Sequence, residues 1–199
     1  MLIALQRKRL QRQKVFSKDK QAVMAFENEI HNLKRLEHRH LVRFVGSYTD
    51  PKYVGIIMEP VADTDLWRYL MRSDFPESDF ANLRSFFGCL TSAVYYLHTM
   101  NCRHKDIKPG NILLKNDQVL ITDFGIAHDW TELDGDTTAG SSVACTYAYA
   151  APEVAQARPR NMSADIWSLG CVFLDILVGI PVHIRHVANQ SYADCSSRI

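Results

Sequence analysis

The chain has 199 residues and a formal net charge of +1, with 47% of its residues hydrophobic and 23% charged. This composition is ordinary for a globular protein, and the near-neutral charge argues against a dedicated binder of nucleic acid or of a membrane surface. The five cysteines are odd in number and show no CxxC spacing, which favours reduced thiols and an intracellular, cytoplasmic location over disulfides or a zinc site.

The hydrophobic pattern predicts strands and one helix in the first third of the chain. Residues 2–10 are typical of a strand, and apolar residues recur at steps of three and four over residues 20–36, which predicts an amphipathic helix. Residues 41–48 and 53–58 are β-rich runs separated by turn residues, so we expect a hairpin there. These elements together predict a small β lobe with one helix over residues 1–60.

The rest of the chain is mainly helical. We predict helices at residues 65–71, 80–100 and 165–178, a strand at 119–122, a polar loop at 127–144 and an irregular tail at 183–199. The longest apolar stretch, residues 166–182, contains Asp175 and is too short to span a bilayer comfortably, so we expect no membrane span. The order of elements predicts an α+β fold of two lobes, with a helical lobe over residues 61–182 and a nucleotide site between the lobes.

Two short strings carry the chemistry. The first is His104-Lys105-Asp106-Ile107-Lys108-Pro109-Gly110-Asn111, and the second, Asp123-Phe124-Gly125, begins twelve positions after the first ends. Together they supply a carboxylate beside cations, an amide, and a second carboxylate followed by a glycine. Such a set suits phosphoryl transfer, because that reaction needs a base for the accepting hydroxyl, a cation for the moving phosphate and oxygen ligands for magnesium.

With these strings in this order, the chain resembles the eukaryotic protein kinase family, of the serine/threonine type, from about residue 4 to residue 180. Residues 58–61 resemble the family's hinge, Ala151-Pro152-Glu153 the end of its activation segment, and residues 165–170 its central helix. The amino-acid sequence of residues 38–50 resembles that of fungal members of the family. The resemblance implies ATP and Mg²⁺ as cofactors, and a serine or threonine hydroxyl of a protein as the acceptor.

The resemblance also implies a role for each residue of the reacting site. Asp106 would orient the acceptor hydroxyl or take its proton, and Lys108 would neutralise charge on the moving phosphoryl group. Asn111 and Asp123 would hold magnesium, because hard oxygen ligands suit a hard cation. Thr146, in the segment that docks the substrate, would form a hydrogen bond near Asp106.

Further residues would hold the rest of the nucleotide. By the same resemblance, Glu59 and Val61 would offer backbone groups to adenine, and Asp65 would meet the ribose. Glu29, on the helix of the small lobe, would pair with a lysine of the first strand. That lysine is either missing, with Gln6 in its place, or is Lys8, which we prefer because Lys8 fits the spacing of the residues downstream.

The chain departs from the family pattern in ways that keep a second reading open. Lys105 replaces the usual arginine before the catalytic aspartate, so we expect weaker coupling to phosphorylation of the activation segment. No glycine-rich G-x-G-x-x-G string precedes residue 8, and the chain ends soon after the central helix, which leaves Glu153 without the arginine that would pair with it. The alternative is therefore a truncated, catalytically impaired kinase or pseudokinase that acts by binding.

A third reading, a phosphotransferase of kinase-like fold that acts on small molecules, is disfavoured by two strings. Asp123-Phe124-Gly125 and Ala151-Pro152-Glu153 are both typical of kinases that act on proteins, and relatives that act on small molecules usually differ at both places. We therefore expect a protein substrate.

Overall fold

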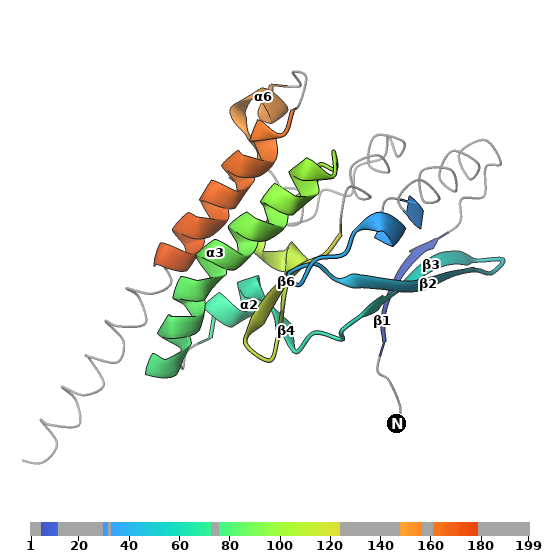
Figure 1. Ribbon diagram of the computed structural model, residues 1–199, viewed down its shortest axis with the longest axis horizontal. Helices are drawn as coiled ribbons and strands as arrows, with labels where there is room; N and C mark the ends of the chain where they lie inside the picture. The colour runs from blue at the N-terminus through green and yellow to red at the C-terminus, as the bar shows by residue number, and fades with distance from the viewer. Residues whose placement is uncertain are drawn as a thin grey trace, which may run out of the picture.

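The computed structural model describes residues 5–11, 30–31, 33–72, 76–123, 148–156 and 161–178. Within these ranges the strands form two three-stranded antiparallel sheets, and the long helices lie on the side of the second sheet (Figure 1). The prediction of an α+β fold with a small β lobe and a helical lobe is confirmed.

The first sheet contains the strands β1 (Gln6–Gln11), β2 (Arg43–Thr49) and β3 (Tyr53–Glu59), in the order β1-β3-β2. Asp50 stabilises the β2–β3 turn, because its Oδ1 accepts hydrogen bonds of 2.7 Å from the backbone N–H groups of both Lys52 and Tyr53. The central strand β3 buries Val54, Ile56 and Met58, which lie on one face at the period of two that a strand requires.

The second sheet contains β4 (Thr64–Asp65), β5 (Ile112–Lys115) and β6 (Gln118–Ile121), in the order β4-β5-β6. The β5–β6 hairpin closes through Asn116 and Asp117, which have φ values of 48° and 61°. Left-handed conformations at both central residues give the hairpin the twist that neighbouring strands need, and Asn and Asp tolerate them well.

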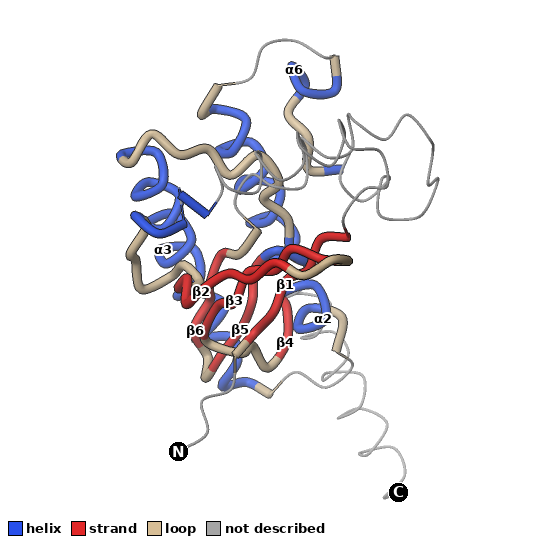
Figure 2. Tube along the Cα trace, turned by 90° about the vertical axis from the view of Figure 1, so that its right-hand side faces the viewer, coloured by secondary structure: helices blue, strands red, loops and turns tan. Residues whose placement is uncertain are grey.

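A short backbone link joins the two sheets. Ile121 of β6 donates a 2.9 Å hydrogen bond to the carbonyl of His40, and its own carbonyl accepts one of 3.1 Å from the N–H of Val42. β6 is therefore hydrogen-bonded to the segment that leads to β2, through a parallel bridge between Leu41 and Ile121. Figure 2 shows the strands of the two sheets in the turned view.

The helical lobe is built on two long helices. α3 (Glu77–Thr99) packs against a helix at residues 163–178, and the two run antiparallel, side by side (Figure 1). The ring centroids of Phe87 and Phe173 are 4.7 Å apart along this contact. The core face of α3 carries apolar side chains at three- and four-residue steps, all almost fully buried: Leu83, Phe86, Leu90, Val94 and Leu97.

The remaining helices in the described ranges are short. α2 (Leu66–Leu70) follows Asp65, whose carboxylate accepts a hydrogen bond from the N–H of Arg68 and so caps the helix. η1 (Pro109–Asn111) is a single 3₁₀ turn directly before β5, and α6 (Pro152–Ala155) begins at a proline. Residues 30–31 and 33–35 are also helical.

Most predicted elements correspond to observed ones, with shifted ends. The helix predicted at 80–100 begins earlier, at Glu77, and the one predicted at 165–178 already includes residue 163. β5 was not predicted, because its four residues are a short apolar run without alternation, buried between two neighbouring strands. The predicted segments at 127–144 and 183–199, and most of the helix predicted at 20–36, lie outside the described residues.

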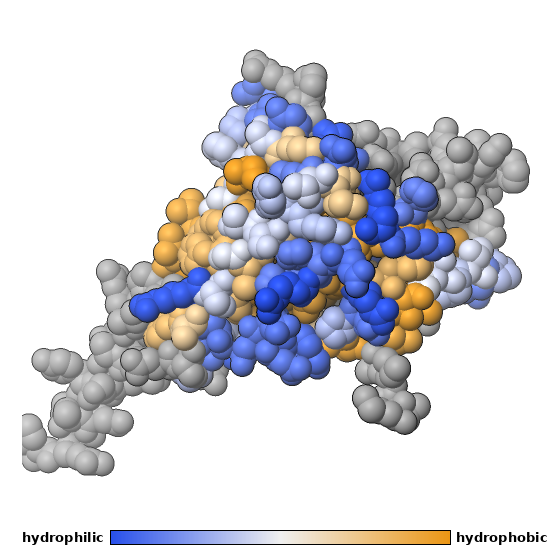
Figure 3. Space-filling view, viewed as in Figure 1, coloured by the Kyte–Doolittle hydropathy of each residue, from blue (hydrophilic) through white to orange (hydrophobic). Residues whose placement is uncertain are grey.

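One side of the helix at 163–178 is exposed. Its outward side chains include Ile166, Trp167, Leu174, Leu177 and Val178, each about half exposed or more. Figure 3 shows hydrophobic residues along the corresponding edge of the molecule. In the part of the chain that the structure describes, no helix combines the length and the apolar character needed to cross a membrane.

Candidate active site

Asp106 and Asn111 form the centre of the candidate site. The amide nitrogen of Asn111 donates to the Oδ2 of Asp106 at 2.9 Å and to the backbone carbonyl of the same residue at 2.8 Å. Nζ of Lys108 lies 2.8 Å from the same Oδ2. The local turn of η1 explains this geometry, since it brings the buried Asn111 side chain back over the residue five positions earlier. The sequence pattern predicted these three residues in one site, and the structure brings them together.

Asp123 lies beside this cluster, two residues beyond the end of β6. The N–H of Thr122 donates to the carbonyl of Asn111 at 3.0 Å, so the residue before Asp123 is bonded to the residue that directly precedes β5. Asp123 has a φ of 66°, a left-handed conformation that turns the chain out of the strand direction. Its Oδ1 lies 3.0 Å from Nζ of Lys8, which projects from β1.

Lys8 offers a cation that the described residues do not fully satisfy. Its Nζ is buried and makes no hydrogen bond among them, although it is within ion-pair distance of Asp123. An ammonium group has three N–H donors, and the single carboxylate of Asp123 leaves donors of Lys8 for a second anionic ligand beside it. Lys8 faces Ile56 of the central strand in the β1–β3 register, which sets its position along the sheet.

The oxygen atoms near Asp123 fit a hard divalent cation bound together with phosphates. The carboxylate of Asp123 and the amide oxygen of Asn111, whose nitrogen is already engaged, are ligands of the kind that Mg²⁺ prefers. No cluster of three or more His, Cys, Asp or Glu side chains suited to a metal occurs among the described residues. A magnesium ion at this place would therefore need oxygen atoms from its ligand, as Mg²⁺ bound to a nucleotide has.

His104 is a buried residue that connects the loop carrying Asp106 to the segment after β6. Its side chain is completely buried, its Nε2 lies 2.9 Å from the carbonyl of Thr122, and its Nδ1 accepts a 3.2 Å hydrogen bond from the N–H of Asp106. This pairing requires a neutral ring with the proton on Nε2. Burial lowers the pKa of His104 below its ordinary value, although the carboxylates of Asp165, Asp106 and Asp123 act in the opposite direction.

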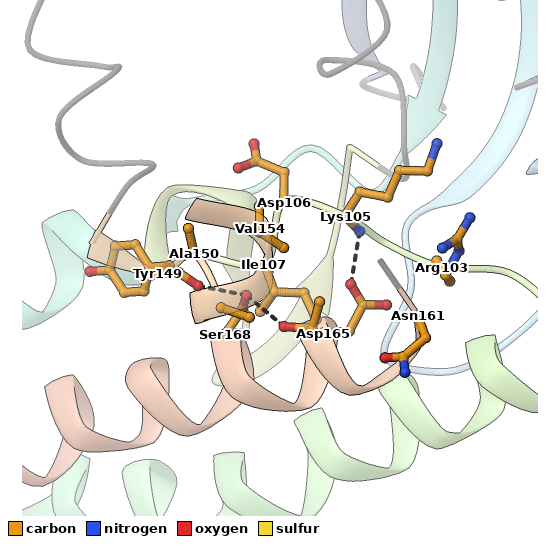
Figure 4. Close-up of a pocket in the computed structure, with 12 residues that line it drawn as sticks. Arg103, Lys105, Asp106, Ile107, Tyr149, Ala150, Val154, Asn161, Asp165 and Ser168 are labelled. Atoms are coloured by element: carbon orange, nitrogen blue, oxygen red, sulfur yellow. Dashed lines mark hydrogen bonds between the residues drawn. The ribbon is translucent and has the colours of Figure 1, made fainter. Parts of the chain in front are cut away.

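Asp165 anchors the loop to the helix at 163–178, a role that the sequence pattern did not indicate. Its Oδ1 accepts from the N–H of Lys105 at 2.9 Å (Figure 4). Its Oδ2 accepts from the N–H of His104 at 2.9 Å, and Nε2 of His98 lies 3.0 Å from the same oxygen. The sequence feature that could have indicated this role is Asp165 itself, a single acidic residue at the start of a strongly apolar predicted helix. A buried carboxylate there needs donors, and the loop provides them.

A small cavity of about 30 Å³ lies between this loop and the helix (Figure 4). It has room for about one water molecule and is far too small for a nucleotide. Tyr149 is one of the lining residues; its hydroxyl donates to Asp175 at 2.6 Å and its carbonyl accepts a 2.7 Å hydrogen bond from the hydroxyl of Ser168. The segment before α6 is thus held against the helix at 163–178.

The residues predicted to contact adenine and ribose lie between the last residue of β3, Glu59, and the end of β4, Asp65. Val61 lies just outside the strand, and its backbone makes no hydrogen bond among the described residues, which leaves its N–H free for a ligand. The side chain of Glu59 accepts a 2.6 Å hydrogen bond from Nε of Arg43. Asp65 is occupied in capping α2, with its Oδ1 2.9 Å from the N–H of Arg68. A contact of Asp65 with ribose stays a prediction.

The predicted roles of Glu29, Thr146 and Glu153 are not tested by the described geometry. Glu29 and Thr146 lie outside the described residues. Glu153 lies in the first turn of α6, and its carboxylate forms no ion pair in the described part of the chain. Its pairing with an arginine therefore remains a prediction.

Comparison with known proteins agrees with the site geometry. A sequence model of the protein kinase domain matches residues 4–198. The chain is 34% identical to an Aurora kinase of Yarrowia lipolytica over 158 residues, which cover 78% of this chain and 40% of that kinase. It is 32% identical to calcium/calmodulin-dependent protein kinase type 1 of Caenorhabditis elegans over 162 residues, 79% of this chain and 44% of the relative.

A human relative is matched over a longer part of the chain. Serine/threonine-protein kinase Sgk2 of Homo sapiens is 32% identical over 186 residues, which cover 92% of this chain and 48% of that kinase. The chain spans less than half the length of these three relatives.

Proposed function

Because the chain belongs to the protein kinase domain family, we propose that it is a serine/threonine kinase that transfers the γ-phosphate of ATP to a protein hydroxyl. The observation that carries this proposal is the contact of Asp106 with both Asn111 and Lys108, next to the pair formed by Lys8 and Asp123. This arrangement offers a base, a cation and two metal ligands in one site, as phosphoryl transfer requires.

Each side chain has a distinct part in the proposed reaction. The Oδ2 of Asp106 is engaged by Asn111 and Lys108, while Oδ1 makes no hydrogen bond among the described residues and can accept the proton of the substrate hydroxyl. The ammonium group of Lys108 pairs with the carboxylate of Asp106 and would neutralise negative charge on the phosphoryl group during its transfer. When bound, ATP with Mg²⁺ supplies the phosphoryl group and neutralises charge on its phosphates.

The nucleotide is proposed to lie between Lys8 and the connection at residues 59–61. Nζ of Lys8 would contact the phosphates, and Asn111 and Asp123 would hold Mg²⁺. The carbonyl of Glu59 and the N–H of Val61 would contact adenine. The free thiols of Cys89, Cys102 and Cys171 support an intracellular, cytoplasmic location for this chemistry.

The test is transfer of labelled phosphate from ATP to mixtures of peptides that carry serine, threonine or tyrosine. We expect magnesium-dependent labelling of serine and threonine peptides, and a loss of kcat of roughly 10²–10⁴-fold in Asp106→Asn. Asp117→Asn is the matched control, because Asp117 lies in the exposed β5–β6 turn, where Asn tolerates the same left-handed conformation. Nucleotide binding without any transfer by the wild-type chain would contradict the proposal and favour a binding role.

A further inference from the structure

A second, larger cavity lies beside the β5–β6 hairpin. It has a volume of about 440 Å³ and is lined by the segment that leads into β2, by residues 59 and 60, and by the β5–β6 hairpin. Asp106, Lys108, Asn111 and Asp123 do not line it. We call it the hairpin groove. Figure 3 shows hydrophilic residues gathered over the β5–β6 hairpin on this face.

Two arginines of the hairpin groove keep hydrogen-bond donors unused. Arg39 is exposed and has no hydrogen bond or ion pair in the described part of the chain. Nε and Nη2 of Arg43 both donate to Oε1 of Glu59, and its Nη1 has no partner among the described residues. The third cation of the groove, Lys115, is paired with Asp63 at 2.6 Å. The groove therefore offers guanidinium groups whose planar donors match a carboxylate.

The floor of the hairpin groove is apolar. It contains Pro60 together with Leu41 and Leu120, which are largely buried beneath the polar walls. An apolar floor below cationic walls suits a ligand that carries an apolar group next to a negative charge.

The form of the walls favours a chain segment over a small molecule. Arg39, Asn116 and Gln118 are exposed, so a small ligand at this place would remain largely in water, whereas small-molecule sites bury most of their ligand. An extended peptide can bind such an open groove, with alternate side chains on the floor and at the walls.

We propose that the hairpin groove docks an acidic peptide segment of a protein partner. A carboxylate of the segment pairs with Arg39 and with the unused face of Arg43, and an apolar side chain covers Pro60. The carboxylate of Glu59 also lines the groove, and its charge disfavours the doubly charged phosphate of a phosphopeptide relative to a single carboxylate.

The test uses a labelled peptide of about seven residues with alternating leucine and aspartate, and fluorescence anisotropy without nucleotide. We expect saturable binding that weakens as salt is raised, and no binding of the alternating leucine–lysine or serine–aspartate peptides. Arg39→Glu should lower the affinity by about tenfold or more, because it places like charges together. Arg84→Glu is the matched control, since Arg84 is exposed on α3 and does not line the groove.

A charge exchange completes the test. The leucine–lysine peptide should bind Arg39→Glu more tightly than it binds the wild type, which a folding defect would not produce. Equal affinity of the leucine–aspartate peptide for wild type and Arg39→Glu would overturn the proposal. So would tighter binding of a phosphoserine version, which would assign the groove to phosphate. Because no nucleotide is present, the outcome does not depend on whether the chain is an active kinase.

Discussion

Lys8 is the residue whose surroundings most directly suggest a phosphate ligand. Its Nζ is buried and pairs with one carboxylate oxygen, Oδ1 of Asp123 at 3.0 Å, which leaves donors of the ammonium group for a further anion. Its neighbour Arg9 is exposed on the other face of β1, with its guanidinium 4.8 Å from the ring centre of Tyr53. Two adjacent cations of one strand therefore have different environments, which makes them a matched pair for mutation.

We expect Lys8→Met to raise the Kd for Mg²⁺-ATP by about tenfold or more, because charge-assisted hydrogen bonds to a phosphate contribute roughly 1.5–3 kcal/mol. Arg9→Met should leave the Kd unchanged. The measurement is isothermal titration calorimetry with a non-hydrolysable ATP analogue. Gln6→Met should also have no effect, and a loss of affinity in that variant instead of in Lys8→Met would assign the lysine position of the family to Gln6.

The buried ring of His104 predicts a pH dependence of stability. Its folded-state pKa lies below its ordinary value because of burial, so between the two values the unfolded chain binds more protons than the folded one. The contribution of the neutral ring is therefore complete above about pH 6.5 and is lost as pH falls below that value toward the folded pKa. Protonation at Nδ1 would also remove the acceptor for the N–H of Asp106.

We expect the free energy of unfolding in urea to fall between about pH 7.5 and about pH 5.5, and to fall less in His104→Phe. The variant should be less stable at the higher pH, since it lacks both ring hydrogen bonds. The pKa values of His38 and His40 are also lowered, first by burial, and both residues are present in both proteins, so the difference reports on His104. Parallel pH profiles would show that His104 titrates normally.

At the scale of elements, the helix at 163–178 holds the loop that carries Asp106. Asp165 accepts hydrogen bonds from two consecutive backbone N–H groups of that loop, at His104 and Lys105, across some 60 residues of sequence. Lys105 adopts a φ of 70°, a conformation that a lysine takes only when its surroundings enforce it. The loop geometry is therefore a consequence of the contact between the two elements.

Asp165→Ala should lower the free energy of unfolding by about 3 kcal/mol, because it leaves buried donors without an acceptor. Asp165→Asn keeps one acceptor oxygen, so its loss should be smaller. Asp175→Ala, on the same helix, removes one hydrogen bond with Tyr149 and provides the comparison. The measurement is equilibrium unfolding in urea. Similar losses in Asp165→Ala and Asp175→Ala would argue against a special anchoring role for Asp165.

At the scale of the whole molecule, the exposed side of the helix at 163–178 should govern solubility. Leu174, Leu177 and Val178 are 61%, 50% and 62% exposed and follow one another at helical spacing. Contiguous apolar surface of this kind promotes association in water.

We expect the chain to associate reversibly in sedimentation velocity experiments as its concentration is raised, and Leu174→Glu to reduce that association. Tyr95→Glu is the control, because Tyr95 is 71% exposed on α3 and is not part of this surface. A monomer at every concentration, for wild type and for both variants, would be the contrary result.

The sequence by itself determined the features that depend on local spacing. The periodic apolar residues of α3 and of the helix at 163–178 predicted both helices to within a few residues, because a helix face is set by neighbours three and four positions apart. The contact of Asn111 with Asp106 is likewise local, since one 3₁₀ turn joins them. The order and spacing of the two strings were therefore enough to predict a kinase-like set of side chains.

Only the tertiary structure decided what depends on distant contacts. Asp165 reaches the loop from another element, Lys8 meets Asp123 across more than a hundred positions, and the hairpin groove combines segments around residues 40, 60 and 118. Local pattern cannot predict such pairs, because they result from how the hydrophobic faces of separate elements are buried against one another, and many arrangements share the same local preferences. Packing selected one of them, and with it the neighbours of each charged group.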